Sequence, residues 1–406
     1  MLQDASVRIT LFKEFSMPTR PDAVIDIPRP SWWTDDVALV REMAERFSEA
    51  EIVPHYERFE AQDMVDRSLW NKAGATGLLC AQIPEAYGGS GGSYAHDAAI
   101  AEALGHTGAD GFGLPLHNAI VAPYILHYGS EDQKRRWLPR LARGEFVGAI
   151  AMTEPGAGSD LQGVRTTARR DGNHYVIDGS KTFITNGQQA NLVIVAAKTD
   201  PAAGGRGMSL VVVETDEVEG FQRGRNLDKI GIKTNDTSEL FFNDVRIPTA
   251  NLLGHDEGQG FAQLMSQLPQ ERLLIANQAM AMIERALAVT IDYVKERRVF
   301  GRPVLDFQNT QFKLAELKAE ATMMKVFINH CVEEHIAGRL TSTTASMVKY
   351  LSTDLQFKTA DECLQLHGGY GYMNEYPIAR MFRDSRVQRI YGGTNEIMKI
   401  LIARSL

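Results

Sequence analysis

The sequence Leu268-Pro269-Gln270-Glu271-Arg272-Leu273-Leu274-Ile275-Ala276 decides the fold, because it lies in an apolar segment that continues at helical spacing to Arg298. Past Gly258 the chain holds further long helical patterns, at residues 308–338, 341–367 and 394–404. Residues 258–406 are therefore predicted to form a helical domain.

Towards the N-terminus the pattern changes twice. Short β-branched runs bounded by Gly, Asp and Asn begin after Phe146 and predict strands at residues 175–177, 181–185, 192–196 and 209–213. Helical patterns precede them, at residues 34–60, 67–76, 94–104, 116–128 and 130–142. We therefore expect four regions in the order leader, helical domain, all-β domain and helical domain, at residues 1–30, 31–148, 149–257 and 258–406.

The composition limits the possible functions. The 406 residues carry a formal net charge of −8, with 44% hydrophobic and 23% charged residues. Phosphate binding needs clustered Lys and Arg, so no nucleic-acid partner is expected. No apolar run approaches the ~18 residues that a membrane-spanning helix needs, so no membrane span is expected either.

The cysteines and the N-terminal residues give no sign of export. Cys80, Cys331 and Cys363 lie far apart without metal-type spacing, which predicts reduced thiols and no metal site. Residues 1–20 include acidic side chains and lack the apolar core of a secretory signal. We expect a cytoplasmic, bacterial-type soluble protein.

Two further stretches accompany the first, Met152-Thr153-Glu154-Pro155-Gly156-Ala157-Gly158-Ser159-Asp160 and Ile390-Tyr391-Gly392-Gly393-Thr394-Asn395-Glu396-Ile397-Met398. Together the three resemble the acyl-CoA dehydrogenase family, flavoenzymes that desaturate acyl thioesters between the α and β carbons, and most of all its long-chain branch. The resemblance runs from about Trp33 to the C-terminus. It implies FAD as cofactor and an α+β multidomain fold with an N-terminal α-helical domain, a middle β-barrel and a C-terminal four-helix bundle.

The resemblance implies that Glu271 is the catalytic base. Many relatives carry the catalytic glutamate two residues before the Thr of a Tyr-Glu-Gly-Thr motif, where this chain has Gly392. The long-chain and isovaleryl branches instead carry it directly before an arginine, on a helix that begins at the equivalent of Pro269. A second carboxylate at position 392 would repel the first, so Gly392 leaves room for Glu271 to reach the same carbon. Taken alone, Glu271-Arg272 could also be a solvated charge pair in the first turn of a helix.

Desaturation also needs donors for the negative charge that develops on the thioester oxygen. By resemblance, these donors are the backbone N–H of Gly392 and a ribityl hydroxyl of FAD. Burial against an acyl chain would raise the pKa of Glu271, whereas Arg272 and a helix N-terminus would lower it. The sequence leaves the direction of this pKa shift open.

The resemblance places the cofactor residues in several segments. Small residues of the 152–160 stretch let the backbone approach the flavin, and Phe183 stands where many relatives have a flavin-covering Trp. Arg297, Phe300 and Gln308 match an element that reaches the flavin of a neighbouring subunit. The predicted cofactor residues are Met152, Thr153, Gly158, Ser159, Phe183, Thr185, Arg297, Phe300, Gln308, Gln365, Gly368, Gly369, Thr394 and Glu396.

The resemblance also implies the partners. Contacts to the acyl-CoA substrate map onto Ser159, Pro269, Gln270, Arg272, Tyr391 and Gly393, although relatives often have Asp in place of Pro269. An electron-transfer flavoprotein is the expected electron acceptor. A homotetramer, built as a dimer of dimers, is the expected assembly.

Other functions fit the same residues. An acyl-CoA oxidase or a nitroalkane-oxidising relative would pass electrons to oxygen and release peroxide. A non-catalytic flavin-binding scaffold would have no use for a buried carboxylate such as Glu271. We expect a dehydrogenase that acts on medium or long acyl chains, straight or branched. Residue identities cannot narrow the chain length further, because one methylene changes substrate discrimination by only ~1–3 kcal/mol.

Overall fold

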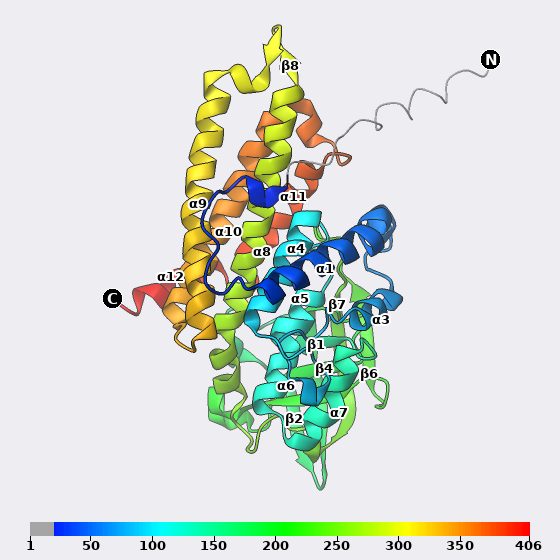
Figure 1. The fold of residues 1–406 in the computed structure, drawn as a ribbon. Coiled ribbons are helices and arrows are strands. Elements are labelled where there is room, and N and C mark those ends of the chain that lie inside the picture. The colour runs from blue at the N-terminus through cyan, green and yellow to red at the C-terminus, as the bar shows by residue number, and fades with distance from the viewer. Residues whose placement is uncertain (1–19) are drawn as a thin grey trace, which may run out of the picture.

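The computed structural model describes residues 20–406, so most of the predicted leader lies outside the described residues. The last residues of the leader are part of the fold. A short 3-10 turn (η1, Pro21–Ala23) packs on α8 (Gly260–Glu296), and Val24 and Ile25 are buried in the apolar core of the C-terminal domain. Figure 1 shows this segment crossing the C-terminal helices before the chain enters the first long helix.

The N-terminal domain is helical, as predicted. It contains α1 (Asp35–Glu51), α2 (Tyr56–Ala61), α3 (Arg67–Ala75), α4 (Tyr94–Thr107), α5 (Leu114–Leu116), a π-helical turn (η4, His117–Val121), α6 (Ala122–Tyr128) and α7 (Glu131–Ala142). The single helix expected over residues 34–60 is broken by a 3-10 turn at Val53–His55, which contains Pro54.

The middle domain is a seven-stranded sheet. Its strands are β1 (Gly148–Ala151), β2 (Thr167–Asp171), β3 (His174–Thr185), β4 (Leu192–Lys198), β5 (Met208–Glu214), β6 (Phe221–Asn226) and β7 (Thr237–Pro248). They run in the order β1-β4-β2-β3-β7-β6, and β5 pairs with the other edge of β4. Among the described residues β5 and β6 do not pair with each other, so the predicted barrel takes the form of a curled, open sheet.

The apolar runs of β4 and β5 are explained by burial on both faces. Leu192 and Ile194 pack with the helices of α6 and α7, whereas Val193 and Val195 face the interior of the curled sheet. A strand covered on both sides has no polar alternation, which is why these two strands are prominent in the sequence.

The C-terminal domain is built on three long helices. α8 packs against α9 (Gln308–Ile336), α10 (Ser342–Leu366) and α4, and the shorter α11 (Pro377–Ser385) and α12 (Asn395–Ala403) pack on α10. A small hairpin of β8 (Arg298–Val299) and β9 (Arg302–Pro303) joins α8 to α9. The predicted order of helix, sheet and helix is confirmed, with α11 as an additional helix.

α8 is long and apolar enough to cross a membrane by length and composition, contrary to the expectation that no segment approaches this limit. In the structure, however, 78% of its most apolar window is buried inside the protein. The apolar residues of α8 therefore form the core of the C-terminal domain.

Candidate active site

Glu271 lies inside α8 and not at its start. The predicted helix start at Pro269 is wrong, because α8 begins at Gly260 and Pro269 lies within it. At 1.5 Å per residue the helix N-terminus is about 16 Å from Glu271, whereas its dipole acts within the first turn. The helix end therefore does not lower the pKa of Glu271.

Burial sets the protonation of Glu271. The residue is 4% exposed, and Tyr124 of α6 donates a hydrogen bond from its hydroxyl to Oε1 at 2.9 Å. Loss of hydration raises the pKa of Glu271 to about 7, against the opposing effects of the Tyr124 hydrogen bond and the Arg272 charge. Because Arg272 is also buried, the two residues are not a solvated charge pair. A carboxyl group with this pKa suits a base that works near neutral pH.

Gly392 lies against α8 one turn beyond Glu271. A Cβ on Gly392 would lie 2.4 Å from Cδ1 of Ile275. The φ of Gly392 is 66°, in the left-handed region that side chains disfavour. The structure thus brings Glu271 and Gly392, the two predicted catalytic positions, to the same face of α8.

Two buried basic side chains, Arg272 and Lys349, hold the turn at Gly392 and Gly393 by its carbonyl groups. Arg272 donates from Nε to the carbonyl of Gly392 at 3.4 Å. Lys349 of α10 donates from Nζ to the carbonyl of Gly393 at 2.8 Å and to Oδ1 of Asn395 at 2.9 Å. With its carbonyls held, the turn presents its N–H groups in one orientation, as a preorganised oxyanion site requires.

The remaining predicted substrate residues of α8 and the turn have different environments. Both ends of the Gln270 amide are occupied inside the protein, by the carbonyl of Ala119 at 2.6 Å and by His335 of α9 at 3.0 Å. Pro269 is half-buried, and Tyr391 is 36% exposed. Gln270 therefore ties α8 to its neighbours.

The loop that contains Met152 and Thr153 is attached to β3 by a buried ion pair. Lys181 donates from Nζ to Oε1 of Glu154 at 2.9 Å and to the carbonyl of Met152 at 3.0 Å. The N–H of Thr182 donates to the carbonyl of Thr153 at 3.0 Å. The loop is therefore held along β3, next to Phe183.

The surface beside this loop fits a flat aromatic ligand. Phe183 is 66% exposed and has a φ of 61°, within an irregular part of the β3–β7 pairing. A bulky residue in this conformation is strained, and such strain is often found at ligand sites. Added Cβ atoms on Gly156 and Gly158 would meet no atom within 4 Å, so the loop backbone is open to a ligand. Ser159 is exposed and Thr185 is partly exposed on the same surface.

A second set of predicted cofactor residues surrounds a pocket of about 470 Å³ at the other end of α8. Arg297, Gly368 and Gly369 line it, and the Arg297 guanidinium lies 5.6 Å from the ring centre of Tyr370. Phe300 is 95% exposed at the turn between β8 and β9. A guanidinium beside open glycine backbone is a donor set that suits a pyrophosphate.

The predicted cofactor residues near Phe183 and those near Arg297 do not meet within one chain. α8 is about 55 Å long at 1.5 Å per residue, and Figure 1 shows β8 at one end of the molecule and the sheet at the other. Gln308 begins α9 and Gln365 lies at the end of α10, both at the β8 end. Phe183 on the sheet and Arg297 at the β8 end of α8 therefore belong to opposite ends of one chain.

Thr394 and Glu396 lie near the base and not near that pocket. Thr394 is the N-cap of α12, directly after the Gly392-Gly393 turn, and its hydroxyl accepts from the N–H of Ile397 at 3.3 Å. Glu396 is exposed in the first turn, where backbone N–H groups lower its pKa and keep it an ionised acceptor.

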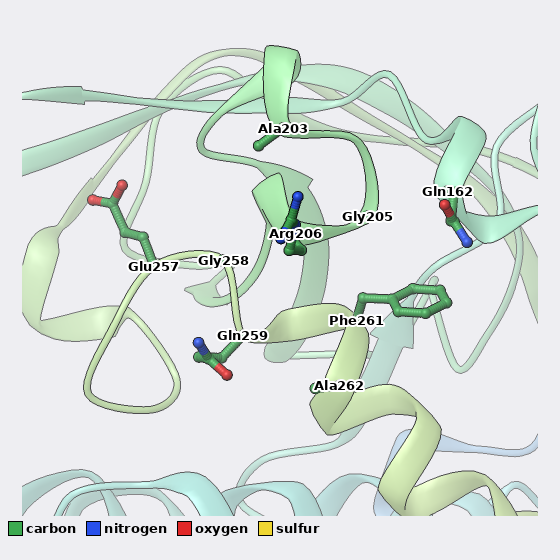
Figure 2. Close-up of a pocket in the computed structure, with 9 residues that line it drawn as sticks. All are labelled: Gln162, Ala203, Gly205, Arg206, Glu257, Gly258, Gln259, Phe261 and Ala262. Carbon is green, nitrogen blue, oxygen red and sulfur yellow. The ribbon is translucent and has the colours of Figure 1, made fainter.

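Another pocket, of about 500 Å³, lies where α8 begins. Figure 2 shows it between the 3-10 segment Pro201–Gly207 and the first turn of α8, with Arg206, Gln162, Gln259 and Phe261 around it. The segment that contains Gln162 follows Ser159 directly. Arg206 and the positive end of α8 favour an anion at this place, whereas the Glu257 carboxylate, which also lines the pocket, acts against one.

Among the described residues, Glu102, His106 and Glu284 have a spacing that could hold a metal ion. Their ligand atoms already have partners. His106 lies between Arg41 at 2.9 Å and Glu284 at 2.8 Å, and Lys325 bonds to both carboxylates. Arg41 can only donate, so Nδ1 of His106 accepts and Nε2 carries the proton. The group is an ion-pair network between helices.

Sequence reasoning missed Tyr124, Ile275 and Lys349. Tyr124 and Lys349 lie in helical patterns in which a buried Tyr or a surface Lys is ordinary. A local signal for their role is absent from the sequence, because each acts on a residue that is distant along the chain.

Comparison with known proteins places the chain in a family. The N-terminal, middle and C-terminal domain models of acyl-CoA dehydrogenases match residues 34–145, 149–245 and 258–406. The mitochondrial long-chain specific acyl-CoA dehydrogenase of Sus scrofa is 50% identical over 370 residues, 91% of this chain and 86% of that protein.

Solved structures agree with this assignment. An acyl-CoA dehydrogenase from Geobacillus kaustophilus has a TM-score of 0.91 and 47% identity, over 93% of this chain and 99% of that chain. A glutaryl-CoA dehydrogenase from Mycobacterium smegmatis, solved in complex with FADH2, has a TM-score of 0.85 and 28% identity, over 92% and 95% of the two chains. The chain belongs to the acyl-CoA dehydrogenase family, the FAD-dependent flavoprotein oxidoreductases of fatty-acid β-oxidation.

Proposed function

We propose that this protein converts a saturated medium- or long-chain acyl-CoA, straight or branched, to the trans-2-enoyl-CoA, with Glu271 as the base. The observation that carries the proposal is the buried Glu271 carboxyl group, whose pKa is raised to about 7, beside the Gly392 turn. A base with this pKa is partly ionised at neutral pH and regains a proton readily.

Each residue of the candidate site has a separate role in the reaction. Glu271 takes the α proton, and the N–H of Gly392 donates to the thioester oxygen as charge develops on it. Arg272 and Lys349 hold the carbonyls of the turn and so keep this N–H in place. FAD, when bound, accepts the β hydride.

The cofactor is assigned to two copies of the chain. Met152 to Ser159, Phe183 and Thr185 would cover the flavin in one subunit, while Arg297 and Gly368 of the next subunit would hold the pyrophosphate. The separation of the two sets along α8 supports this arrangement, and with it the predicted homotetramer as a dimer of dimers. We assign an electron-transfer flavoprotein as the electron acceptor.

The CoA end of the substrate is assigned to the surface between Ser159 and the start of α8. Ser159 is exposed there, and the pocket of about 500 Å³ beside Arg206 offers a positive helix end to a phosphate group. The acyl chain is assigned to the neighbourhood of Glu271 and Gly392.

Anaerobic addition of saturated acyl-CoA esters from four to eighteen carbons, with the oxidised flavin absorbance as readout, tests the proposal. We expect bleaching that peaks at one chain length and is lost in Glu271→Gln, since the amide keeps the size but not the basicity of the side chain. The exposed Glu57→Gln is the matched control and should bleach like the wild type.

Three outcomes would contradict the proposal. Full bleaching in Glu271→Gln would show that Glu271 is not the base. A flavin that stays oxidised with every ester would favour a different substrate or a non-catalytic scaffold. Peroxide released in proportion to turnover in air would favour an oxidase.

A further inference from the structure

We infer that Tyr124 is a positioning residue for Glu271: it holds one carboxylate oxygen and leaves the other to take the α proton. The inference rests on the proposed function, because it gives Tyr124 a role only if Glu271 is the base. Tyr124 lies in the first turns of α6, directly after the π-helical turn at His117–Val121.

The hydrogen bond is enclosed by the fold. Tyr124 is 0% exposed, and its ring packs between the N-terminal helices and the sheet. Its hydroxyl donates to Oε1 of Glu271 at 2.9 Å. Burial and the nearby carboxylate raise the pKa of the Tyr124 phenol well above its usual value, so it remains a proton donor at every pH of interest.

The two oxygens of Glu271 therefore have different roles. No described residue forms a hydrogen bond with Oε2. Oε2 is also not among the side-chain oxygens that are fully buried without a partner, so it keeps accessible surface. A carboxylate fixed through Oε1 turns a single free oxygen towards the site, which restricts the orientations that the base must search.

The step balances as a proton transfer. The α C–H bond of the thioester breaks and an O–H bond forms on Oε2, while the electron pair stays with the substrate. Bound FAD would accept the β hydride, so that this pair would form the α,β double bond. Tyr124 keeps its own proton and donates to Oε1 throughout, and this donation stabilises the ionised form of the base.

The other charged or titratable groups near Glu271 come from four helices, α8, α10, α9 and α6. Arg272 on α8 is the one whose charge acts on Glu271 in the same direction as the Tyr124 hydrogen bond. Lys349 on α10 contacts the Gly393 carbonyl, and His335 on α9 contacts Gln270. On α6, Tyr128 and His127 both contact Gln267.

Tyr124→Phe is the decisive variant, because it removes only the hydroxyl. We expect the acid limb of the kcat/KM profile, followed by anaerobic flavin bleaching, to move to higher pH by about one unit. Infrared titration of the Glu271 carboxyl group, with Glu271→Gln as the blank, should show the same shift without turnover. Tyr128→Phe, whose hydroxyl contacts Gln263 and Gln267, is the matched control and should leave both titrations unchanged.

A second variant covers the case in which Tyr124→Phe fails to fold. Site-specific 3-fluorotyrosine at position 124 has nearly the same size but a more acidic phenol, and should move both titrations to lower pH. An unchanged acid limb and infrared pKa in both variants, with slower turnover at every pH, would reduce Tyr124 to a packing role. That outcome differs from failure of the proposed function. If the proposed function failed, Glu271→Gln itself would keep turning over.

Discussion

Ile275 occupies the space in front of Gly392: its Cδ1 lies 2.4 Å from the position that a Cβ at residue 392 would take. Ile275 and Glu271 are one turn apart on α8 and share a face. The helix that carries the candidate base therefore also closes the position at which many relatives carry theirs.

This relationship predicts the cost of a side chain at position 392. Gly392→Ala should destabilise the protein by about 1–2 kcal/mol for its left-handed φ and by roughly 1–3 kcal/mol for overpacking against Ile275. Ile275→Val deletes the Cδ1 methyl. In the double variant it should therefore remove most of the overpacking cost of Gly392→Ala. Urea unfolding of the four proteins of this double-mutant cycle gives the coupling.

Gly338 is the matched control for that cycle. It has a φ of 70°, and a Cβ there would meet no atom within 4 Å. Gly338→Ala should show the backbone cost alone and no coupling to Ile275→Val. Equal costs for Gly338→Ala and Gly392→Ala would show that Ile275 does not limit the position.

Glu271 should destabilise the folded protein at neutral and alkaline pH. Its pKa is about 7 in the fold, against 4.5 for an unperturbed Glu side chain. For an acid with a raised folded pKa, stability is full below pH 4.5 and falls as pH rises to about 7. The loss is roughly 3 kcal/mol, at ~1.4 kcal/mol per pH unit. Glu271→Gln lacks this titration and keeps an acceptor for Tyr124, so its melting temperature should exceed that of the wild type at pH 8.

The test compares melting temperatures at pH 5 and pH 8. The gain in Glu271→Gln should be much smaller at pH 5, where the wild-type carboxyl group is protonated in the fold. Glu57→Gln, at an exposed position, should have the wild-type melting temperature at both pH values. A gain in Glu271→Gln that is the same at pH 5 and pH 8 would contradict the raised pKa.

Lys349 should matter for turnover more than for substrate binding. Lys349→Met removes the donor to the Gly393 carbonyl while filling the same buried space, so the Gly392 N–H loses part of its support. We expect kcat to fall by about tenfold to a hundredfold with little change in KM and with flavin retained. Rapid-mixing kinetics measure both constants.

Lys358, also on α10, is the control for that substitution. It is exposed and pairs with Glu320, so Lys358→Met should leave both constants unchanged. A Lys349→Met protein with wild-type kcat would show that the turn keeps its orientation without this donor.

A shared flavin site predicts complementation between two inactive variants. Arg297→Ala should weaken flavin binding in the neighbouring subunit's site, whereas Glu271→Gln disables only the site of the subunit that carries it. In a hybrid of the two, one site keeps an intact Glu271 together with an intact Arg297 from the partner. Co-expressed and doubly tagged hybrids should regain up to half of the wild-type activity per dimer.

Geometry makes this complementation specific. If Arg297 and Glu271 served the same site from one chain, every site in the hybrid would be defective and no activity would return. Arg297→Lys is the conservative variant, and because an ammonium group lacks the guanidinium fork, it should restore flavin binding only in part.

Much of the architecture could be predicted from local pattern. The long helices and strands β4 and β5 were predicted because burial leaves a periodic or continuous apolar signal. β1, β2, β6 and β7 were not predicted. The exposed positions of β2 and β6 carry Arg, Asp and Gln, and their sequences lack alternation. The start of α8 was placed too late, since Pro269 is typical of a helix start and packing of residues 260–268 overrode that preference.

The sequence by itself determined the kind of chemistry: a carboxylate before an arginine, a glycine in place of a second carboxylate, and small residues along a flavin. Only the tertiary structure decided how Glu271 is tuned. Its pKa depends on burial and on Tyr124, which lies 147 residues away in sequence, and Arg272 reaches across 120 residues to the Gly392 carbonyl. Desolvation and hydrogen bonding act over a few ångströms of space, and a chain reveals such neighbours only after it has folded.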